Sequence, residues 1–433
     1  MPLFNKLLEP SAFQLLNYNL NKISQKTVNK NYPAKFYYVW NYLEWGGAQI
    51  LLFGLMKEGK NIGEVLAVIP ENSNEQLLRF LKNLNVECKF VDSYTDTKPA
   101  VKIKRKLERH WKKLWCEFVY FRYLKNLDLE NSIIHAEFAP WHSFLILFLL
   151  AKKTPVFITV HNALPPVPRW RYFSWQVKFW LLSRRKNFHI FTANKDTKES
   201  LKTLVPQKAF DKIKIIYANV NPHEIDEALN SEIDRTELLK KYKIPENKFL
   251  VFCVGQFIDR KGRWIFLEAA RKLLEKNNDI AFVWISNSKP DADDLAKADS
   301  YNLGENFRLI TSDQIGTAHI DLFKLLRPAD LFALPSYLEG LPISIIEAMA
   351  LGIPTISTNI NAIPEAIRHL ETGWLIEPGN SDLLVEAVQT LKDDEDLRNK
   401  LSQKGRKFAL ENFNESVVAK IALESYLDAF RSK

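Results

Sequence analysis

Two carboxylates frame a sharp corner in the stretch LPSYLEGLPISIIEAMALGIPTIS, residues 334–357. Glu339 and Glu347 stand eight positions apart, on either side of a Gly-Leu-Pro sequence. Side chains that meet on one helix are three or four positions apart, so these two are not a simple helical pair. Ionised carboxylates accept hydrogen bonds, and the hydroxyl groups of a bound ligand are suitable donors.

The corner predicts the start of a helix. Pro342 suits the first turn, where its missing N–H costs nothing, and the pattern over 343–351 is helical. Glu339 would then lie on the preceding loop, and Glu347 would lie more than one turn inside the helix. The unpaired N–H groups near 341–344 and the helix dipole would form an anion site beside that loop. A sugar nucleotide carries both the phosphates and the hydroxyls that this arrangement would bind.

Strands and helices alternate along the chain on both sides of a charged, helix-prone stretch near 221–248. Such alternation predicts an α/β protein with two doubly wound parallel sheets, which bind ligands in the crevice at the carboxyl ends of their strands. The predicted segments are an N-terminal extension 1–34, domains 35–220 and 221–414, and a C-terminal helix 415–433. The expected strands cover 36–40, 64–70, 132–137, 156–162, 189–194 and 214–220 in the first domain, and 249–255, 280–286, 307–310, 331–334, 354–358 and 373–378 in the second.

Length and composition fit a cytoplasmic protein of two domains. The chain has 433 residues, 46% of them hydrophobic and 26% charged. Its longest clean apolar run, 143–151, is far shorter than the roughly 20 residues that a membrane span needs. Residues 1–20 do not resemble a signal peptide, and three scattered cysteines without metal-ligand spacing favour a reducing compartment.

Three motifs in order carry a family resemblance. VGQFIDRKG (254–262), RPADLFALPS (327–336) and EGLPISIIEAMALGIPTIST (339–358) resemble the signature of the family 4 retaining glycosyltransferases, also called glycosyl transferases group 1. WGGAQ (45–49) is similar to the glycine loop of that family. The resemblance covers about 35–430 and implies the GT-B fold, with an acceptor-binding first domain, a nucleotide-sugar-binding second domain and a C-terminal helix that returns to the first.

The resemblance also implies roles for particular residues. Glu347 would accept the ribose hydroxyls of the nucleotide, Glu339 would lie beside the transferred sugar, and Lys261 would neutralise the diphosphate. His161, in TVHN at the end of an expected strand, matches a histidine on the acceptor side, whereas His135, His142 and His189 are expected to be structural. The remaining expected donor-binding residues are Gly46, Gly47, Gly255, Gln256, Gly340, Leu341, Pro342 and Ile343.

The implied reaction is metal-independent transfer of a hexose with retained configuration, from a nucleoside-diphosphate sugar to a glycan or lipid-linked saccharide. The nucleotide sugar is a co-substrate, and no cofactor is expected. As the diphosphate leaves, fixed donors aimed at its oxygens should be the largest catalytic term. Asp291 and Asp293 spell a D-x-D sequence. It is interpreted as a helix cap at 293 or 294 rather than as a metal site.

The sequence departs from the family pattern at four places. Gln256 stands where the family usually has an arginine, and Arg260 and Arg263 are the candidates to supply that charge. Ser286 and Ser288, Thr311, and the pair Asn361-Ala362 stand where glycines are usual. Added side chains shrink a donor pocket, so a second hypothesis is a catalytically weak or inactive GT-B protein that binds nucleotides or glycans.

The positive charge lies in the first half of the chain. Residues 1–220 contain 34 Lys or Arg and 17 Asp or Glu, and the remainder contains 26 and 34. Two basic, aromatic segments, 98–125 and 169–186, suit the headgroup layer of an anionic membrane, and the alternative is that each packs its apolar stripe on the sheet. No nucleic-acid-binding motif accompanies the charge, so nucleic acid is not expected as a partner. A peripheral position on the inner membrane face would suit a lipid-linked acceptor.

Overall fold

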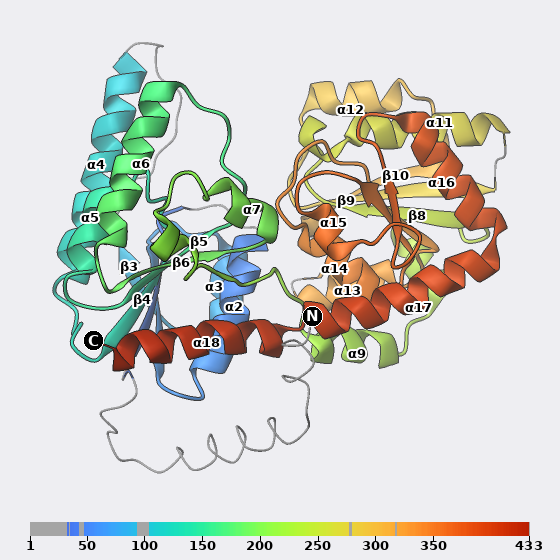
Figure 1. Ribbon diagram of the computed structural model, residues 1–433. Coiled ribbons are helices and arrows are strands. Elements are labelled where there is room, and N and C mark those ends of the chain that lie inside the picture. Colours follow the sequence, from blue (N-terminus) through green and yellow to red (C-terminus); the bar gives the residue numbers. More distant parts are fainter. Residues whose placement is uncertain are drawn as a thin grey trace.

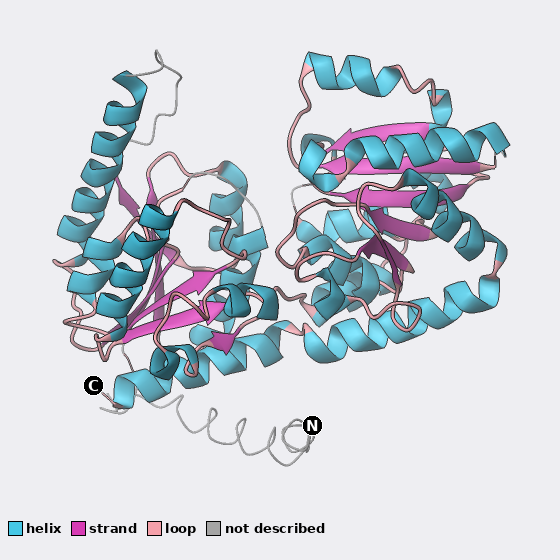
Figure 2. Cartoon of the chain, turned by 45° about the horizontal axis from the view of Figure 1, so that its top comes forward, coloured by secondary structure: helices cyan, strands magenta, loops and turns pink. Residues whose placement is uncertain are grey.

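The computed structural model describes residues 33, 35–42, 47–92, 104–276, 279–316 and 318–432. Two α/β domains lie side by side, and each is built around one parallel sheet (Figure 1). Figure 2 shows the two sheets between their covering helices. The predicted extension 1–34 lies outside the described residues, apart from Pro33. Within the described residues, no helix has both the length and the apolar character needed to cross a membrane.

The first domain has a parallel sheet of seven strands within the described residues, in the order β3-β2-β1-β4-β5-β6-β7. The five central strands of this order are apolar runs that are buried between two helical layers. Its strands are β1 (Lys35–Val39), β2 (Glu64–Pro70), β3 (Glu87–Val91), β4 (Ser132–Ala136), β5 (Val156–Val160), β6 (Phe188–Thr192) and β7 (Lys214–Ile215).

Two helical layers cover this sheet. One hydrophobic cluster joins it to α4 (Lys104–Leu124), α5 (Phe144–Leu150) and α6 (Arg169–Ser183). The cluster on the opposite face joins it to α2 (Gly47–Gly59), α3 (Glu75–Asn83) and the C-terminal helix α18 (Glu415–Arg431). Short helices α7 (Lys195–Ser200) and α8 (Gln207–Phe210) follow β6.

The second domain has a parallel sheet of six strands within the described residues, in the order β10-β9-β8-β11-β12-β13. Its strands are β8 (Phe249–Val254), β9 (Ile280–Ser286), β10 (Phe307–Thr311), β11 (Leu331–Leu334), β12 (Thr355–Thr358) and β13 (Trp374–Ile376). Its helices are α9 (Pro222–Asn230), α10 (Arg235–Lys241), α11 (Arg263–Lys276), α12 (Ala292–Asp299), α13 (His319–Leu326), α14 (Ile343–Ala350), α15 (Ile363–Ala366), α16 (Ser381–Asp393) and α17 (Glu395–Asn412), with the 3-10 turns η3 (Asp259–Lys261), η4 (Gly304–Asn306) and η5 (Ser312–Gln314).

The chain crosses between the domains twice, and the two crossings are hydrogen-bonded to each other. The Val220 amide donates to the Phe413 carbonyl at 2.9 Å, and the Glu415 amide donates to the Val220 carbonyl at 2.9 Å. Helix α18 then packs on the first domain, where the Tyr426 hydroxyl lies 2.5 Å from Nδ1 of the buried His135. The C-terminal helix therefore completes the core of the first domain.

The sequence analysis missed strand β3 and predicted strand β7 to be longer than it is. Strand β3 alternates charged and apolar residues at the edge of the sheet, so it lacks the apolar run of its neighbours. The strand expected over 214–220 ends at Ile215, because the chain leaves the sheet there for the crossing at Val220. The interpretation of Asp293 or Asp294 as a cap is wrong, since α12 begins earlier and Asp291 accepts the Asp294 amide at 2.8 Å.

Candidate active site

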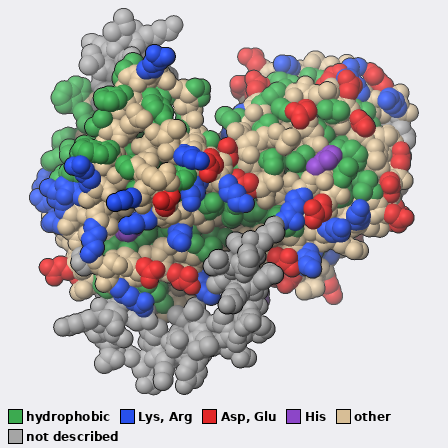
Figure 3. Space-filling view, viewed as in Figure 1, with side chains coloured by type: hydrophobic (Ala, Val, Ile, Leu, Met, Phe, Trp, Pro, Cys, Tyr) green, Lys and Arg blue, Asp and Glu red, His purple; other side chains and the backbone are tan. Residues whose placement is uncertain are grey.

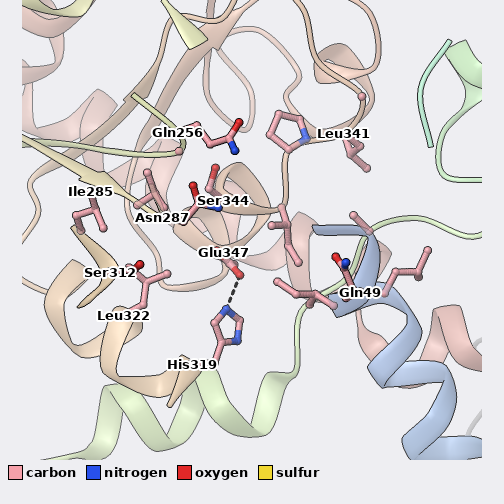
Figure 4. Close-up of a pocket in the computed structure, with 18 of the residues that line it drawn as sticks. Gln49, Gln256, Ile285, Asn287, Ser312, His319, Leu322, Leu341, Ser344 and Glu347 are labelled. Carbon is pink, nitrogen blue, oxygen red and sulfur yellow. Dashed lines mark hydrogen bonds and ion pairs between the residues drawn. The ribbon is translucent and has the colours of Figure 1, made fainter. Parts of the chain in front are cut away.

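A cavity of about 550 Å³ lies between the two domains, at the carboxyl ends of their strands. Figure 4 shows Gln49 of α2 on one side of this space, opposite residues of the second domain that include Gln256 and Glu347. The structure brings together most of the residues that the sequence singled out. Those that line the cavity are His161, Gly255, Gln256, Lys261, Glu339, Gly340, Leu341, Pro342, Ile343 and Glu347.

The two glycines of the first-domain loop are placed differently. Gly46 lies outside the described residues. Gly47 begins α2, and Gln49 and Ile50 in the same turn line the cavity. The N-terminus of α2 therefore faces the cavity from the first domain.

Glu347 is a buried carboxylate in the middle of α14. Its Oε1 lies 2.8 Å from His319 Nε2 (Figure 4). On the other side of the ring, His319 Nδ1 lies 3.2 Å from Glu224 Oε2. Burial lowers the pKa of His319, but the carboxylates of Glu347 and Glu224 outweigh burial and raise that pKa to about 10. His319 therefore carries a charge at neutral pH and fixes the orientation of Glu347.

Glu339 is the second buried carboxylate, and cations surround it. Its Oε1 lies 2.6 Å from Lys261 Nζ and accepts the Ser336 hydroxyl at 2.7 Å, while Oε2 lies 3.5 Å from Arg260 Nη1. Lys261 ends the turn η3, directly after β8 and the loop that contains Gln256. The cluster holds two cationic side chains at the cavity wall, beside the start of α14.

The cation that accompanies Lys261 is Arg260 and not Arg263. Arg260 lines the cavity, whereas Arg263 is buried and pairs with Asp294 at 2.5 Å and with Asp259 at 3.0 Å. Gln256 occupies the cavity wall without a charge. Arg260, four residues further along the chain, therefore supplies the positive charge that an arginine at position 256 would supply.

The start of α14 supplies backbone donors to the same space. Pro342 is the N-cap residue, and the first N–H groups of an α-helix have no intrahelical partner. Leu341, Ile343 and Ser344 line the cavity. These N–H groups, the helix dipole, Lys261 and Arg260 together form a site for an anion such as a diphosphate.

Gly340 permits close contact between the domains. A Cβ atom at this position would lie 2.9 Å from the His161 carbonyl oxygen and 2.6 Å from Asn162 Oδ1, both in the first domain. We expect Gly340→Ala to displace the 335–342 loop and to lower kcat/KM by about 10²-fold, the effect of a 1 Å misplacement at an active site. Steady-state kinetics check this, with Gly59→Ala as the control, because a Cβ at Gly59 meets no atom closer than 3.4 Å. Equal kinetics for the two variants would contradict the account.

His161 pairs with a carboxylate that the sequence analysis did not single out. Glu137, directly after β4, is buried, and its Oε2 lies 2.6 Å from His161 Nε2. Burial lowers the pKa of His161, but Glu137 outweighs burial and raises that pKa above 6.5. Since the folded chain holds this proton more tightly, the pair stabilises the fold fully below pH 6.5, and this contribution is lost as the pH rises through the folded pKa.

Replacing Glu137 with glutamine should reverse the direction of that shift. Without the carboxylate charge, burial dominates, and we expect the pKa of His161 in Glu137→Gln to fall below its usual value. A histidine-ring NMR titration measures this. The pKa of His189, which burial lowers to about 4, is the internal control and should not move. A His161 pKa that stays the same in the variant would show that Glu137 does not set it.

The glycine departures change local contacts without closing the cavity. Ser286 lines the cavity, and its hydroxyl donates to the Ser288 carbonyl at 2.7 Å. Asn361 takes the left-handed conformation, φ 44°, that glycine would adopt there. After it, Glu365 of α15 accepts the amides of Lys195 at 2.9 Å and Asp196 at 3.0 Å, so this loop contacts the first domain.

Sequence reasoning missed His319, Gln49 and Phe80 as cavity residues. His319 begins an ordinary apolar helix, and only the fold brings it beside Glu347 and within 6.4 Å, between ring centres, of Phe80 in the first domain. Gln49 lies in the WGGAQ motif, and a polar residue directly before the apolar run 50–55 is the signal that could have found it.

Comparison with known proteins agrees with this geometry. Residues 234–408 match the family model for glycosyl transferases group 1. Among curated relatives, an uncharacterized glycosyltransferase of Methanocaldococcus jannaschii is 27% identical over 57% of this chain and 61% of its own length. A UDP-Gal:alpha-D-GlcNAc-diphosphoundecaprenol alpha-1,3-galactosyltransferase of Escherichia coli is 29% identical over 45% of this chain and 50% of its own length. The chain thus spans about half to three fifths of the relatives it matches.

Solved structures extend the likeness to nearly the whole fold. A glycosyltransferase from Rickettsia africae has a TM-score of 0.74 at 18% identity, covering 93% of this chain and 100% of its own. Anabaena HepE in complex with UDP-glucose has a TM-score of 0.71 at 15% identity, covering 90% of this chain and 98% of its own. The predicted GT-B fold is confirmed by these structures, and the family resemblance is confirmed for the second domain by the match of residues 234–408 to glycosyl transferases group 1.

Proposed function

We propose that this protein transfers a hexose, with retained anomeric configuration and without a metal, from a nucleoside-diphosphate sugar to a glycan or lipid-linked saccharide. The observation that carries the proposal is the convergence of three features on one cavity. These are the buried carboxylate of Glu347, the Lys261–Arg260–Glu339 cluster and the start of α14. Each suits one part of a sugar nucleotide.

The donor would lie along the second-domain wall of the cavity. Glu347 would accept the two ribose hydroxyls, and the diphosphate would lie against Lys261 and the N–H groups at the start of α14. Glu339 would lie beside the transferred sugar. Charge that develops on the leaving diphosphate would meet donors that are already in position, which is the most effective form of electrostatic stabilisation.

The acceptor would enter from the first domain, where His161 and Asn162 line the cavity. A retaining transfer on one face of the sugar depends on how the acceptor hydroxyl is positioned, and His161 held by Glu137 offers a fixed group for that purpose. The E. coli relative is named for a diphosphoundecaprenol-linked saccharide, which supports a lipid-linked acceptor. An enzyme with such an acceptor would work at the cytoplasmic face of a membrane.

The test is hydrolysis and transfer with a panel of UDP- and GDP-sugars. We expect the wild-type protein to release nucleoside diphosphate from one of these donors, with or without a chelator, and Glu347→Ala to lose the activity. Product analysis by NMR should show the α-anomer from an α-linked donor. Loss of turnover on chelation would contradict metal independence, and an inverted product would contradict retention.

The same assay separates the enzyme from the alternative of an inactive binding protein. Gln256 and the missing glycines motivate that alternative, because at the cavity wall Gln256 removes a cation and Ser286 adds a side chain. Nucleotide binding without turnover on any donor and acceptor of the panel would favour it. The position of Arg260 at the cavity weighs against it.

A further inference from the structure

Six aromatic side chains form an exposed surface on the outer layer of the first domain. We call this the aromatic surface: Trp111, Trp115 and Phe118 on α4, and Trp170, Phe173 and Trp180 on α6. Trp111 and Trp170 are 70% and 72% exposed, and all six are at least 44% exposed. Figure 3 shows hydrophobic side chains gathered at this end of the molecule with Lys and Arg beside them. Exposed apolar groups on this scale mark an interaction site.

These exposed rings are not the side chains that pack α4 and α6 against the sheet. On α4 the sheet-facing residues are Cys116, Tyr120 and Leu124, which belong to the buried cluster. On α6 they are Trp175 and Phe179. The alternative that each stripe simply packs on the sheet is therefore excluded for Trp111 and the other described aromatic side chains. Both helices are apolar on two sides, which a helix covering a sheet does not need.

The charges on the α6 side of the aromatic surface have one sign. Segment 169–186 contains six Lys or Arg and no Asp or Glu. The guanidinium carbon of Arg184 lies 3.7 Å from the centre of the Trp180 ring, and that of Arg171 lies 5.9 Å from the centre of Trp170. Aromatic rings with adjacent cations match the headgroup layer of a bilayer that contains anionic lipids.

We infer that the aromatic surface inserts into the headgroup layer of an anionic membrane. The basic residues attract the surface, and the rings then leave water at the boundary with the acyl chains. The exposed rings add an apolar contact, which salt does not screen, to the attraction of the basic residues. The inference rests on the proposed function and deepens it, because it names the surface by which the protein would contact the membrane.

The surface lies close in sequence to the acceptor side of the cavity. His161 lines the cavity, and Trp170, nine residues later, belongs to the aromatic surface. Nine residues span at most about 30 Å, so the site and the membrane contact are within the reach of one short segment. A saccharide on a lipid anchor could therefore be presented to His161 while the aromatic surface stays in the bilayer.

The test is co-sedimentation of the full chain with vesicles of phosphatidylcholine, with and without phosphatidylglycerol, at low and high salt. We expect binding to the anionic vesicles, and part of it should persist at high salt. The triple variant Trp115→Ser, Trp170→Ser, Phe173→Ser should lose at least about tenfold in partition coefficient, since each ring contributes burial energy. The control is Val417→Ser, Ile421→Ser, which removes exposed aliphatic side chains from α18 and should bind as wild type.

Two outcomes would overturn the inference. One is equal vesicle binding, or none, for the wild type and the aromatic variant. The other is a concentration-dependent dimer that the aromatic variant abolishes while vesicles bind neither protein, which would assign the surface to a second copy of this chain. Donor hydrolysis in the absence of vesicles should be the same in both proteins. Absence of hydrolysis in the wild type, with vesicle binding intact, would contradict the proposed function and not the membrane contact.

Discussion

Replacement of Lys261 with alanine is expected to lower kcat for sugar transfer by about 10²-fold or more, the usual effect of removing one fixed donor to developing charge. Lys261 Nζ lies at the cavity wall, 2.6 Å from Glu339. The ammonium group would neutralise the diphosphate as its bond to the sugar breaks, so the effect should fall on kcat more than on KM.

The matched control is Lys272→Ala. Lys272 lies in the same domain on α11 and also pairs with a carboxylate, Asp382, at 2.6 Å, but it does not line the cavity. Its removal should leave kcat within twofold of wild type, because an exposed ion pair contributes little to stability. Equal loss in the two variants would mean that Lys261 acts only on the fold.

Replacement of Glu347 with glutamine should raise the Kd of the nucleoside diphosphate by about 10- to 100-fold. A hydrogen bond to a charged group contributes about 1.5–3 kcal/mol, and the glutamine keeps the shape of the side chain while it removes the charge. Calorimetric titration with UDP and GDP measures this for whichever nucleotide binds. Unchanged affinity would remove Glu347 from the nucleotide site.

Two further measurements make the Glu347 result specific. Glu268→Gln is the control, because Glu268 is partly buried and paired with Arg271 at 2.6 Å on α11, outside the cavity. The pKa of His319 should fall from about 10 in Glu347→Gln, since Glu347 is the largest of the carboxylate contributions that raise it. In the wild type this histidine stabilises the fold fully below pH 6.5, and the contribution is lost as the pH rises toward about 10.

Much of the fold could be predicted from local pattern. Apolar runs bounded by Gly and Pro mark most strands, and the corner at Gly340 and Pro342 marks the start of α14. The edge strand β3 could not be found in this way, because an edge strand buries little and keeps charged residues. Both domains follow from alternation alone.

The site residues that lie in a motif could be predicted from the sequence. The contacts that only the fold brings about could not. Lys261, Glu339 and Glu347 lie in ordered motifs, but the choice between Arg260 and Arg263 depends on which one Asp294 binds. The Glu137 contact with His161 joins the ends of the paired strands β4 and β5, and these two residues lie 24 positions apart in the sequence. Which aromatic rings of α4 and α6 are exposed likewise depends on which face of each helix packs against the sheet.

The central claim is that a nucleoside diphosphate binds with its diphosphate at Lys261 and the start of α14, and with its ribose at Glu347. A crystal structure of the complex with a nucleoside diphosphate tests this most directly. We predict diphosphate oxygens about 3 Å from Lys261 Nζ and from the first N–H groups of α14, with the ribose hydroxyls at Glu347. A nucleotide bound elsewhere, or one whose diphosphate points away from α14, would contradict the account.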